Sequence, residues 1–216
     1  MKPARPGAEA VRLSTPEDGP FAIGMPWSDE DLVARSVAGD TDSFNELVRR
    51  WERPIYALAY RQIGREEDAR DVCQETFLRA YRALGGFRGQ AKFSSWLYRI
   101  ALNLCRDWLR RERRAPMVQV PEDVDVADLV AARAPVESFE EHVARRALGR
   151  AVRRALARLP EEQRTVIVLK EYHGLTFQEI AELVGCPLST VKTRLYQGLV
   201  VLRRQLARGA ASAAVG

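Results

Sequence analysis

Apolar residues recur every three or four positions through most of this chain, and no stretch alternates apolar and polar residues as a strand would. This spacing places apolar side chains on one face of a helix, so the pattern predicts an all-α protein. In the amino-terminal half it predicts a helix opened by a Ser28 and Asp31 capping box, then helices through 44–48, about 65–84 and about 94–114. Pro54 is expected to break or bend the second of these helices.

The helical pattern stops between 115 and 138, where three prolines stand among mostly acidic charges, which predicts an acidic linker. It resumes at Phe139 and continues to Leu159, with Pro160 placed to open the next helix at its first position. We therefore expect two small helical domains. The predicted organisation is a flexible leader (1–27), a first domain (28–114), the linker (115–138), a second domain (139–208) and a flexible tail (209–216).

Composition narrows the possible functions of the 216-residue chain. Its net charge of +5 and sequence pI of about 9.4 favour a polyanionic partner. Cys73, Cys105 and Cys186 form no CxxC spacing and are expected to be buried as small hydrophobes. His142 and His173 lie near no cysteine or carboxylate cluster, so the sequence predicts no metal site, no cofactor and no enzyme. Without an apolar run of membrane-spanning length, the protein is expected to be cytoplasmic, with no membrane insertion.

The segment from Thr176 to Leu195 predicts a helix-turn-helix. Thr176 and Glu179 are spaced as a capping box, and Gly185 supplies the left-handed residue that ends the first helix. In the second helix, the residues expected to pack inward are Leu188, Val191, Leu195 and Leu202. The residues then turned outward or onto the flanks are Ser189, Lys192, Thr193, Arg194, Tyr196 and Gln197. This face suits a DNA major groove, although many helical hairpins bind no DNA.

The helix from about Ser94 carries a stripe of basic residues and one amide, spaced by three or four positions. Its members are Arg99, Asn103, Arg106, Arg110 and Arg113. Aromatic and cationic residues surround the start of this helix, namely Phe87, Arg88, Lys92, Phe93, Trp96 and Tyr98. Rings beside cations are the chemistry that holds unpaired bases. An arginine stripe is also typical of a merely solvated helix face, and several of the rings have the spacing of core residues.

The preceding helix has an unusual outer face, which consists of Asp71, Gln74, Glu75, Leu78 and Arg82. A leucine beside acidic and amide groups, on a basic protein, suits a protein partner better than DNA.

Three blocks of this sequence in order, 71–77, 93–103 and the helix-turn-helix, resemble the extracytoplasmic-function sigma factors of the sigma-70 family. The resemblance covers about residues 28–208. It implies a sigma factor that binds core RNA polymerase and directs promoter-specific initiation, with an anti-sigma protein as a further expected partner. It also implies that the acidic linker runs toward the RNA path of the polymerase.

The resemblance also implies a role for each surface. Contact with a coiled coil of the largest polymerase subunit would come from Asp71, Gln74, Glu75 and Leu78. The minus-ten element would contact Phe87, Arg88, Lys92, Trp96, Arg99, Asn103, Arg106 and Arg110. The minus-thirty-five element would contact Ser189, Thr190, Lys192, Thr193, Arg194, Tyr196 and Gln197. Leu199 and Leu202 would meet the polymerase flap.

One departure from the family concerns Gln197 and Gly198, where many relatives have Arg-Ala. Glutamine pairs with adenine where arginine prefers guanine, so the preferred minus-thirty-five sequence does not carry over. The main alternative function is a stand-alone helix-turn-helix regulator, which would be expected to dimerise on two half-sites and which leaves the first domain unexplained.

Overall fold

The computed structural model describes residues 27–89, 91–112 and 139–213, and helices dominate all three ranges. The amino-terminal unit consists of α1 (Asp29–Val37), α2 (Thr41–Ile63), α3 (Glu66–Ala83) and α4 (Phe93–Glu112). The carboxy-terminal unit consists of α6 (Phe139–Ala157), α7 (Glu161–Ile167), α8 (Phe177–Val184) and α9 (Leu188–Ala213). No strand occurs in these ranges, so the prediction of an all-α protein is confirmed.

The ends of the first helices follow the predicted capping chemistry. Ser28 Oγ accepts from the Asp31 backbone N–H at 3.1 Å, and the Asp31 carboxylate accepts from the Ser28 backbone N–H. These two bonds complete the predicted capping box. Asp40 caps α2 by accepting from the backbone N–H groups of Asp42 and Ser43. The Ser43 hydroxyl, which donates to Asp40 at 2.8 Å, contributes most to lowering the Asp40 pKa to about 2, followed by the Arg35 guanidinium and the Ser43 backbone N–H.

Pro54 lies inside α2 and does not end it, so the expected break is not there. Its ring removes one N–H donor from the helix, a loss that costs about 3 kcal/mol in a typical helix interior. Ile55 and Leu58, which follow at once, are both fully buried. Burial of two such side chains contributes roughly 1.5–3 kcal/mol each, enough to offset the proline. Tertiary packing therefore keeps α2 continuous.

The predicted helices over 65–84 and 94–114 are present as α3 and α4. Between them, a 3-10 turn runs over Leu84–Gly86, directly after the end of α3. In the carboxy-terminal unit, Pro160 is the cap before α7 rather than its first residue. α7 runs on into one π-helical turn, Val168–Tyr172. α9 continues to Ala213, into the segment expected to be the tail.

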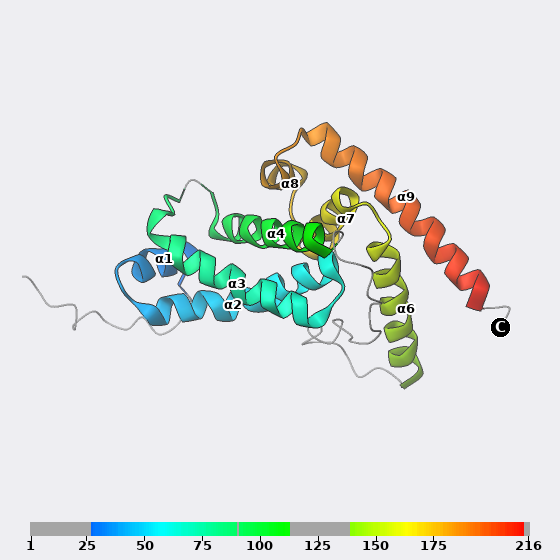
Figure 1. Cartoon of the computed structure of the whole chain (residues 1–216), viewed down its shortest axis with the longest axis horizontal. Coiled ribbons are helices and arrows are strands. Elements are labelled where there is room, and N and C mark those ends of the chain that lie inside the picture. The colour runs from blue at the N-terminus through cyan, green and yellow to red at the C-terminus, as the bar shows by residue number, and fades with distance from the viewer. Residues whose placement is uncertain (1–26, 90, 113–138, 214–216) are drawn as a thin grey trace, which may run out of the picture.

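The two units pack against each other. One connected set of buried apolar side chains runs from Leu32 in α1 to Leu195 in α9. α2 contacts α6 and α7, and α4 contacts α8. Figure 1 shows α8 lying over α4, with α6 and α9 at the far end of the molecule. Among the described helices, none combines the length and the apolar character that a bilayer crossing requires.

Candidate nucleic-acid and polymerase surfaces

The predicted basic stripe lies along the outer side of α4. Arg99, Asn103 and Arg110 are exposed and Arg106 is half-buried, whereas Arg113 lies outside the described residues. Arg106 Nη1 donates to Asn103 Oδ1 at 3.0 Å, which orients the amide within the stripe. The residues buried on the opposite face are Phe93, Leu97, Tyr98, Ala101, Leu102, Leu104 and Cys105. α4 thus separates a core face from a face of cations and one amide.

The aromatic residues at the start of α4 divide between core and surface. Phe93 and Tyr98 belong to the core. Phe87 and Trp96 are half-buried, with ring centroids 5.0 Å apart. Arg88 and Lys92 beside them are exposed. Only Phe87 and Trp96 therefore retain ring surface for a base, while the other two rings support the helix that presents the stripe.

The helix-turn-helix forms as the sequence predicts. Thr176 and Glu179 make the reciprocal capping box at the start of α8, with the Glu179 N–H bonded to Thr176 Oγ1 at 3.2 Å. Gly185 ends α8 in the left-handed region, with φ of 69°, and its N–H donates to the Ala181 carbonyl at 2.9 Å. An L-residue with a side chain rarely adopts this φ, so glycine at this position sets the angle between α8 and α9.

The outer face of α9 carries polar side chains. Ser189, Thr193 and Gln197 are exposed, and Tyr196 is 63% exposed. Exposed Lys192 and half-buried Thr190 and Arg194 flank this face. One inward assignment is wrong: Leu188 is exposed, because as the first residue of α9 it lies beyond the reach of the core that buries Val191 and Leu195. Leu199 and Leu202, assigned to the flap, are half-buried against the core.

Gly198 packs closely against α7. A Cβ added there would lie 2.8 Å from Ile167 Cδ1 and 3.2 Å from Gln163 Cβ, both on α7. Glycine at this position lets α9 approach α7 more closely than alanine would. Gln197 beside it is exposed on the outer face.

The unusual face of α3 is exposed as expected. Asp71, Gln74 and Leu78 are exposed, with Leu78 at 44%, and Glu75 is half-buried beside Arg79, whose Nε donates to it at 2.7 Å. The opposite face, with Ala69, Cys73, Phe77 and Ala80, is buried. No core contact accounts for this combination of leucine, amide and carboxylates.

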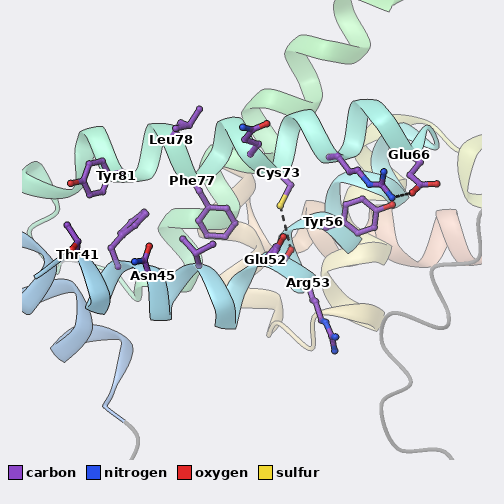
Figure 2. Close-up of a pocket in the computed structure, with 14 residues that line it drawn as sticks. Thr41, Asn45, Glu52, Arg53, Tyr56, Glu66, Cys73, Phe77, Leu78 and Tyr81 are labelled. Atoms are coloured by element: carbon purple, nitrogen blue, oxygen red, sulfur yellow. Dashed lines mark hydrogen bonds and ion pairs between the residues drawn. The ribbon is translucent and has the colours of Figure 1, made fainter.

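A groove of about 810 Å³ runs between α2 and α3 beside this face (Figure 2). Its apolar lining includes Phe44, Phe77 and Tyr81, and Gln74 and Leu78 form part of its rim. The exposed face of α3 therefore adjoins a cavity that an apolar side chain of a partner could fill.

Figure 2 also shows Cys73 within this groove, with its thiol directed at α2. The Cys73 thiol donates to the Glu52 carbonyl at 3.6 Å, and burial raises its pKa to about 12. Cys105 is fully buried with a pKa likewise raised to about 12, so both act as the small hydrophobes expected, whereas Cys186 is half-buried.

The stripe on α4, and Lys92 directly before α4, contact acidic groups and one backbone carbonyl of the carboxy-terminal unit. Lys92 Nζ lies 2.9 Å from Glu179 Oε1, and this bond contributes most to lowering the Glu179 pKa to about 2. Arg99 Nη2 donates to the Glu182 backbone carbonyl at 3.2 Å. These contacts join the predicted minus-ten surface to α8, the helix that precedes the predicted minus-thirty-five surface on α9.

Four residues that hold the two units together escaped the sequence analysis. Arg164 is buried, and its Nη1 donates to the Gln62 backbone carbonyl at 2.5 Å. Thr165 Oγ1 donates to Gln62 Oε1 at 3.3 Å. His173 Nδ1 lies 3.0 Å from the Tyr98 hydroxyl, although its sequence neighbours gave no sign of a role. Arg164 and Gln62 lie near helix ends, where sequence reasoning expects arginine and glutamine to be exposed. They are buried because the two units pack against each other.

Comparison with known families matches both units. The family model described as Sigma-70 region 2 matches residues 47–115, and that described as Sigma-70, region 4 matches residues 149–202. The RNA polymerase sigma-H factor of Pseudomonas aeruginosa is 37% identical over 180 residues, which cover 82% of this chain and 93% of the relative. The extracytoplasmic-function (ECF) RNA polymerase sigma factor SigW of Bacillus subtilis is 37% identical over 179 residues, or 78% of this chain and 91% of the relative.

Solved structures with a similar fold include two bound to other proteins. CnrH, in complex with the cytosolic domain of CnrY, is 28% identical, with a TM-score of 0.60 over 83% of this chain and 97% of CnrH. The sigma factor RpoE of Bartonella quintana, in complex with the anti-sigma factor NepR, is 20% identical, with a TM-score of 0.60 over 76% of this chain and 96% of RpoE. The second likeness concerns the fold alone.

Proposed function

Because this chain belongs to the extracytoplasmic-function sigma factors of the sigma-70 family, which direct promoter-specific initiation by RNA polymerase, we propose that its exposed surfaces divide this work between polymerase and two DNA elements. The observation that carries the proposal is the presence, in one chain, of three exposed polar faces on α3, α4 and α9. A stand-alone regulator would need only the last. The chain contributes recognition, not catalysis, and acts in the cytoplasm with polymerase.

We assign core polymerase binding to Asp71, Gln74, Glu75 and Leu78 on α3. An acidic and amide rim around an exposed leucine suits a partner surface that offers cations around an apolar side chain. The adjoining groove between α2 and α3 would receive that side chain, since Gln74 and Leu78 belong to both surfaces.

The minus-ten element is assigned to α4 and the turn before it. Arg99, Arg106 and Arg110 would hold phosphates, because guanidinium groups bind them without regard to sequence. Asn103 would read a base, since an amide offers both a donor and an acceptor. Lys92 and Arg88 would add charge, while Phe87 and Trp96 offer the remaining ring surface for an unstacked base.

The minus-thirty-five element is assigned to the outer face of α9 in the major groove. Ser189, Thr193 and Gln197 offer donors and acceptors to base edges, and Tyr196 lies exposed among them. Thr190, Lys192 and Arg194 flank this face. Leu199 and Leu202, half-buried, would contact the polymerase flap only at their exposed edges.

An anti-sigma protein is a further proposed partner. Support comes from the fold shared with CnrH, which was solved in complex with the cytosolic domain of CnrY, and with the sigma factor RpoE, which was solved in complex with the anti-sigma factor NepR. Such a partner would compete for the polymerase face or the DNA faces.

Run-off transcription tests the proposed function. Core polymerase with this protein should start transcripts at specific sites in a genomic promoter library, and core polymerase alone should not. Specific operator binding without any transcript across the library would replace this function with that of a stand-alone regulator.

A further inference from the structure

Two lysines converge on one aromatic ring at the start of the helix-turn-helix. The Nζ atoms of Lys170 and Lys192 lie 5.0 and 5.8 Å from the centroid of the Phe177 ring, distances at which a ring attracts a cation. Only four of the 34 basic residues in this chain are lysines, so the convergence of two of them on one ring is unusual. The DNA contacts proposed for α9 include Lys192 but give Phe177 no role.

Lys170 and the turn that follows it fix the position of the ring. Lys170 lies in the π-helical turn Val168–Tyr172, and its Nζ donates to the Leu175 backbone carbonyl at 3.1 Å. A π turn within a helix is rare and occurs mostly at functional sites. Leu175 precedes Phe177 by two residues, and the Phe177 ring is half-buried against the core. The ring therefore has little freedom to move.

Lys192, by contrast, is available to DNA. Its side chain is exposed, and within the described part of the chain it makes neither a hydrogen bond nor an ion pair. All three of its N–H donors therefore remain for a phosphate. A lysine stem is long and flexible, and ordering it on binding costs affinity. A ring that already holds the ammonium in place reduces this cost.

We propose that Phe177 is a positioning residue for minus-thirty-five recognition: its ring holds the Lys192 ammonium where α9 meets a DNA phosphate. This inference rests on the proposed function for the assignment of Lys192 to DNA. Phe177 acts through Lys192, since a phenyl ring has no hydrogen-bond donor of its own. A purely structural Phe177 would instead support α8 by its contact with the core, whatever the charge distribution of its ring.

Fluorination of the Phe177 ring separates these two roles. Each fluorine draws electrons from the face of the ring and weakens its attraction for a cation, while the apolar packing stays nearly the same. Full-length chains would carry ordinary, difluorinated or trifluorinated phenylalanine at position 177. Equal midpoints of thermal unfolding would show that the fold is retained. The matched control is the same series with Lys192→Gln, which removes the charge that the ring would hold.

The measurement is affinity, by fluorescence anisotropy, for a short duplex that the unchanged chain selects from a random pool. With Lys192 present, the trifluorinated ring should weaken binding roughly two- to fivefold, which corresponds to the ~0.5–1 kcal/mol of an exposed cation–π contact. The difluorinated ring should weaken it less. With Lys192→Gln, fluorination should have no effect. An affinity that ignores fluorination in both series would overturn the proposal. So would an affinity that rises with fluorination, because the ring would then compete with the phosphate.

Lys192→Gln alone distinguishes failure of this inference from failure of the proposed function. With ordinary phenylalanine at position 177, this change should weaken binding and make the slope of log K on log salt shallower by about 0.9, as for one lost phosphate contact. If it does so while fluorination has no effect, Lys192 binds DNA without Phe177, and only the positioning role is wrong. If Lys192→Gln changes neither quantity, or if the chain selects no duplex, the assignment of Lys192 to DNA is itself wrong and the positioning role fails with it.

Discussion

Tyr98 of α4 and His173, just before α8, meet ring to ring, with centroids 5.1 Å apart and the Tyr98 hydroxyl 3.0 Å from His173 Nδ1. The contact lies between the amino-terminal and carboxy-terminal units, so the titration of His173 bears on whether they stay together. Burial, and to a lesser extent the Arg61 guanidinium on α2, lower the His173 pKa from 6.5 to about 4.

Acid should therefore destabilise the packed structure. Above pH 6.5 His173 is neutral whether packed or free, and stability is unaffected. Between pH 6.5 and about 4, the His173 imidazole is protonated in the unfolded chain but stays neutral in the packed structure. The free energy of unfolding therefore falls as the pH falls. The change in the His173 pKa from 6.5 to about 4 corresponds to about 3 kcal/mol, reached below pH 4. Urea unfolding at stepped pH should show this loss, and His173→Phe should flatten it. His142→Gln, which changes the other histidine, is the control; a His173→Phe variant with unchanged pH dependence would refute the prediction.

Gly198→Ala should destabilise the carboxy-terminal unit by about 1 kcal/mol. Overpacking against Ile167 costs roughly 1–3 kcal/mol, and better helix propensity returns up to about 1 kcal/mol. Ile167→Val removes the Cδ1 atom that the new methyl would meet at 2.8 Å. In that background Gly198→Ala should become neutral or stabilising, as measured by thermal unfolding of a double-mutant cycle. Additive effects of the two changes would show that Gly198 is not a packing residue.

Gln74→Ala with Glu75→Ala should weaken binding to core polymerase without lowering the unfolding midpoint. Gln74 is exposed, and Glu75 makes only a surface pair with Arg79, which contributes about 1 kcal/mol or less. Affinity would be measured by fluorescence anisotropy and stability by circular dichroism. Glu67→Ala, at an exposed position on the same helix, is the control for any loss of helix charge. Loss of helicity in the double variant would mean that the α3 face is structural.

Local chemistry in the sequence was enough to predict both halves of the helix-turn-helix and the separation of polar from buried faces on α3 and α4. Capping at Thr176 and the left-handed turn at Gly185 depend only on neighbours within a few residues, so sequence spacing reveals them. Pro54 shows the limit of this reasoning, since the burial of Ile55 and Leu58 against distant helices outweighs a local rule.

The contacts between the units were beyond sequence reasoning. Arg164 donates to the backbone carbonyl of Gln62, which lies 102 positions earlier in the sequence. No sequence pattern predicts which backbone carbonyl a distant arginine will contact. The sequence suggests that Tyr98 is a core residue and that His173 has no partner, so their contact could not be predicted either. The roles of the individual site residues remain predictions, which mutants must separate.

Asn103 and Arg110 offer the sharpest separation of roles on α4. Asn103 is exposed, and its Oδ1 accepts from Arg106 at 3.0 Å, which leaves the amide N–H₂ and one acceptor site for a base edge. Arg110 has a side chain 64% exposed, and its Nη1 lies 3.6 Å from Asp107, an arrangement suited to a phosphate but not to reading sequence. Asn103→Ala should therefore lower open-complex formation most at promoters with the preferred minus-ten base.

Arg110→Ala, in contrast, should weaken binding to every promoter alike and reduce the salt slope by about 0.7–0.9, as expected for one lost phosphate contact. The lost base contact in Asn103→Ala should cost about 1–3 kcal/mol of discrimination, which permanganate footprinting on single-base promoter variants can resolve. Because both residues lie on one exposed side of one helix, a general loss of α4 structure would affect the two variants equally. If Asn103→Ala instead reduces every promoter variant to the same extent, Asn103 positions Arg106 or holds a phosphate, and base reading must be assigned to another residue of the stripe.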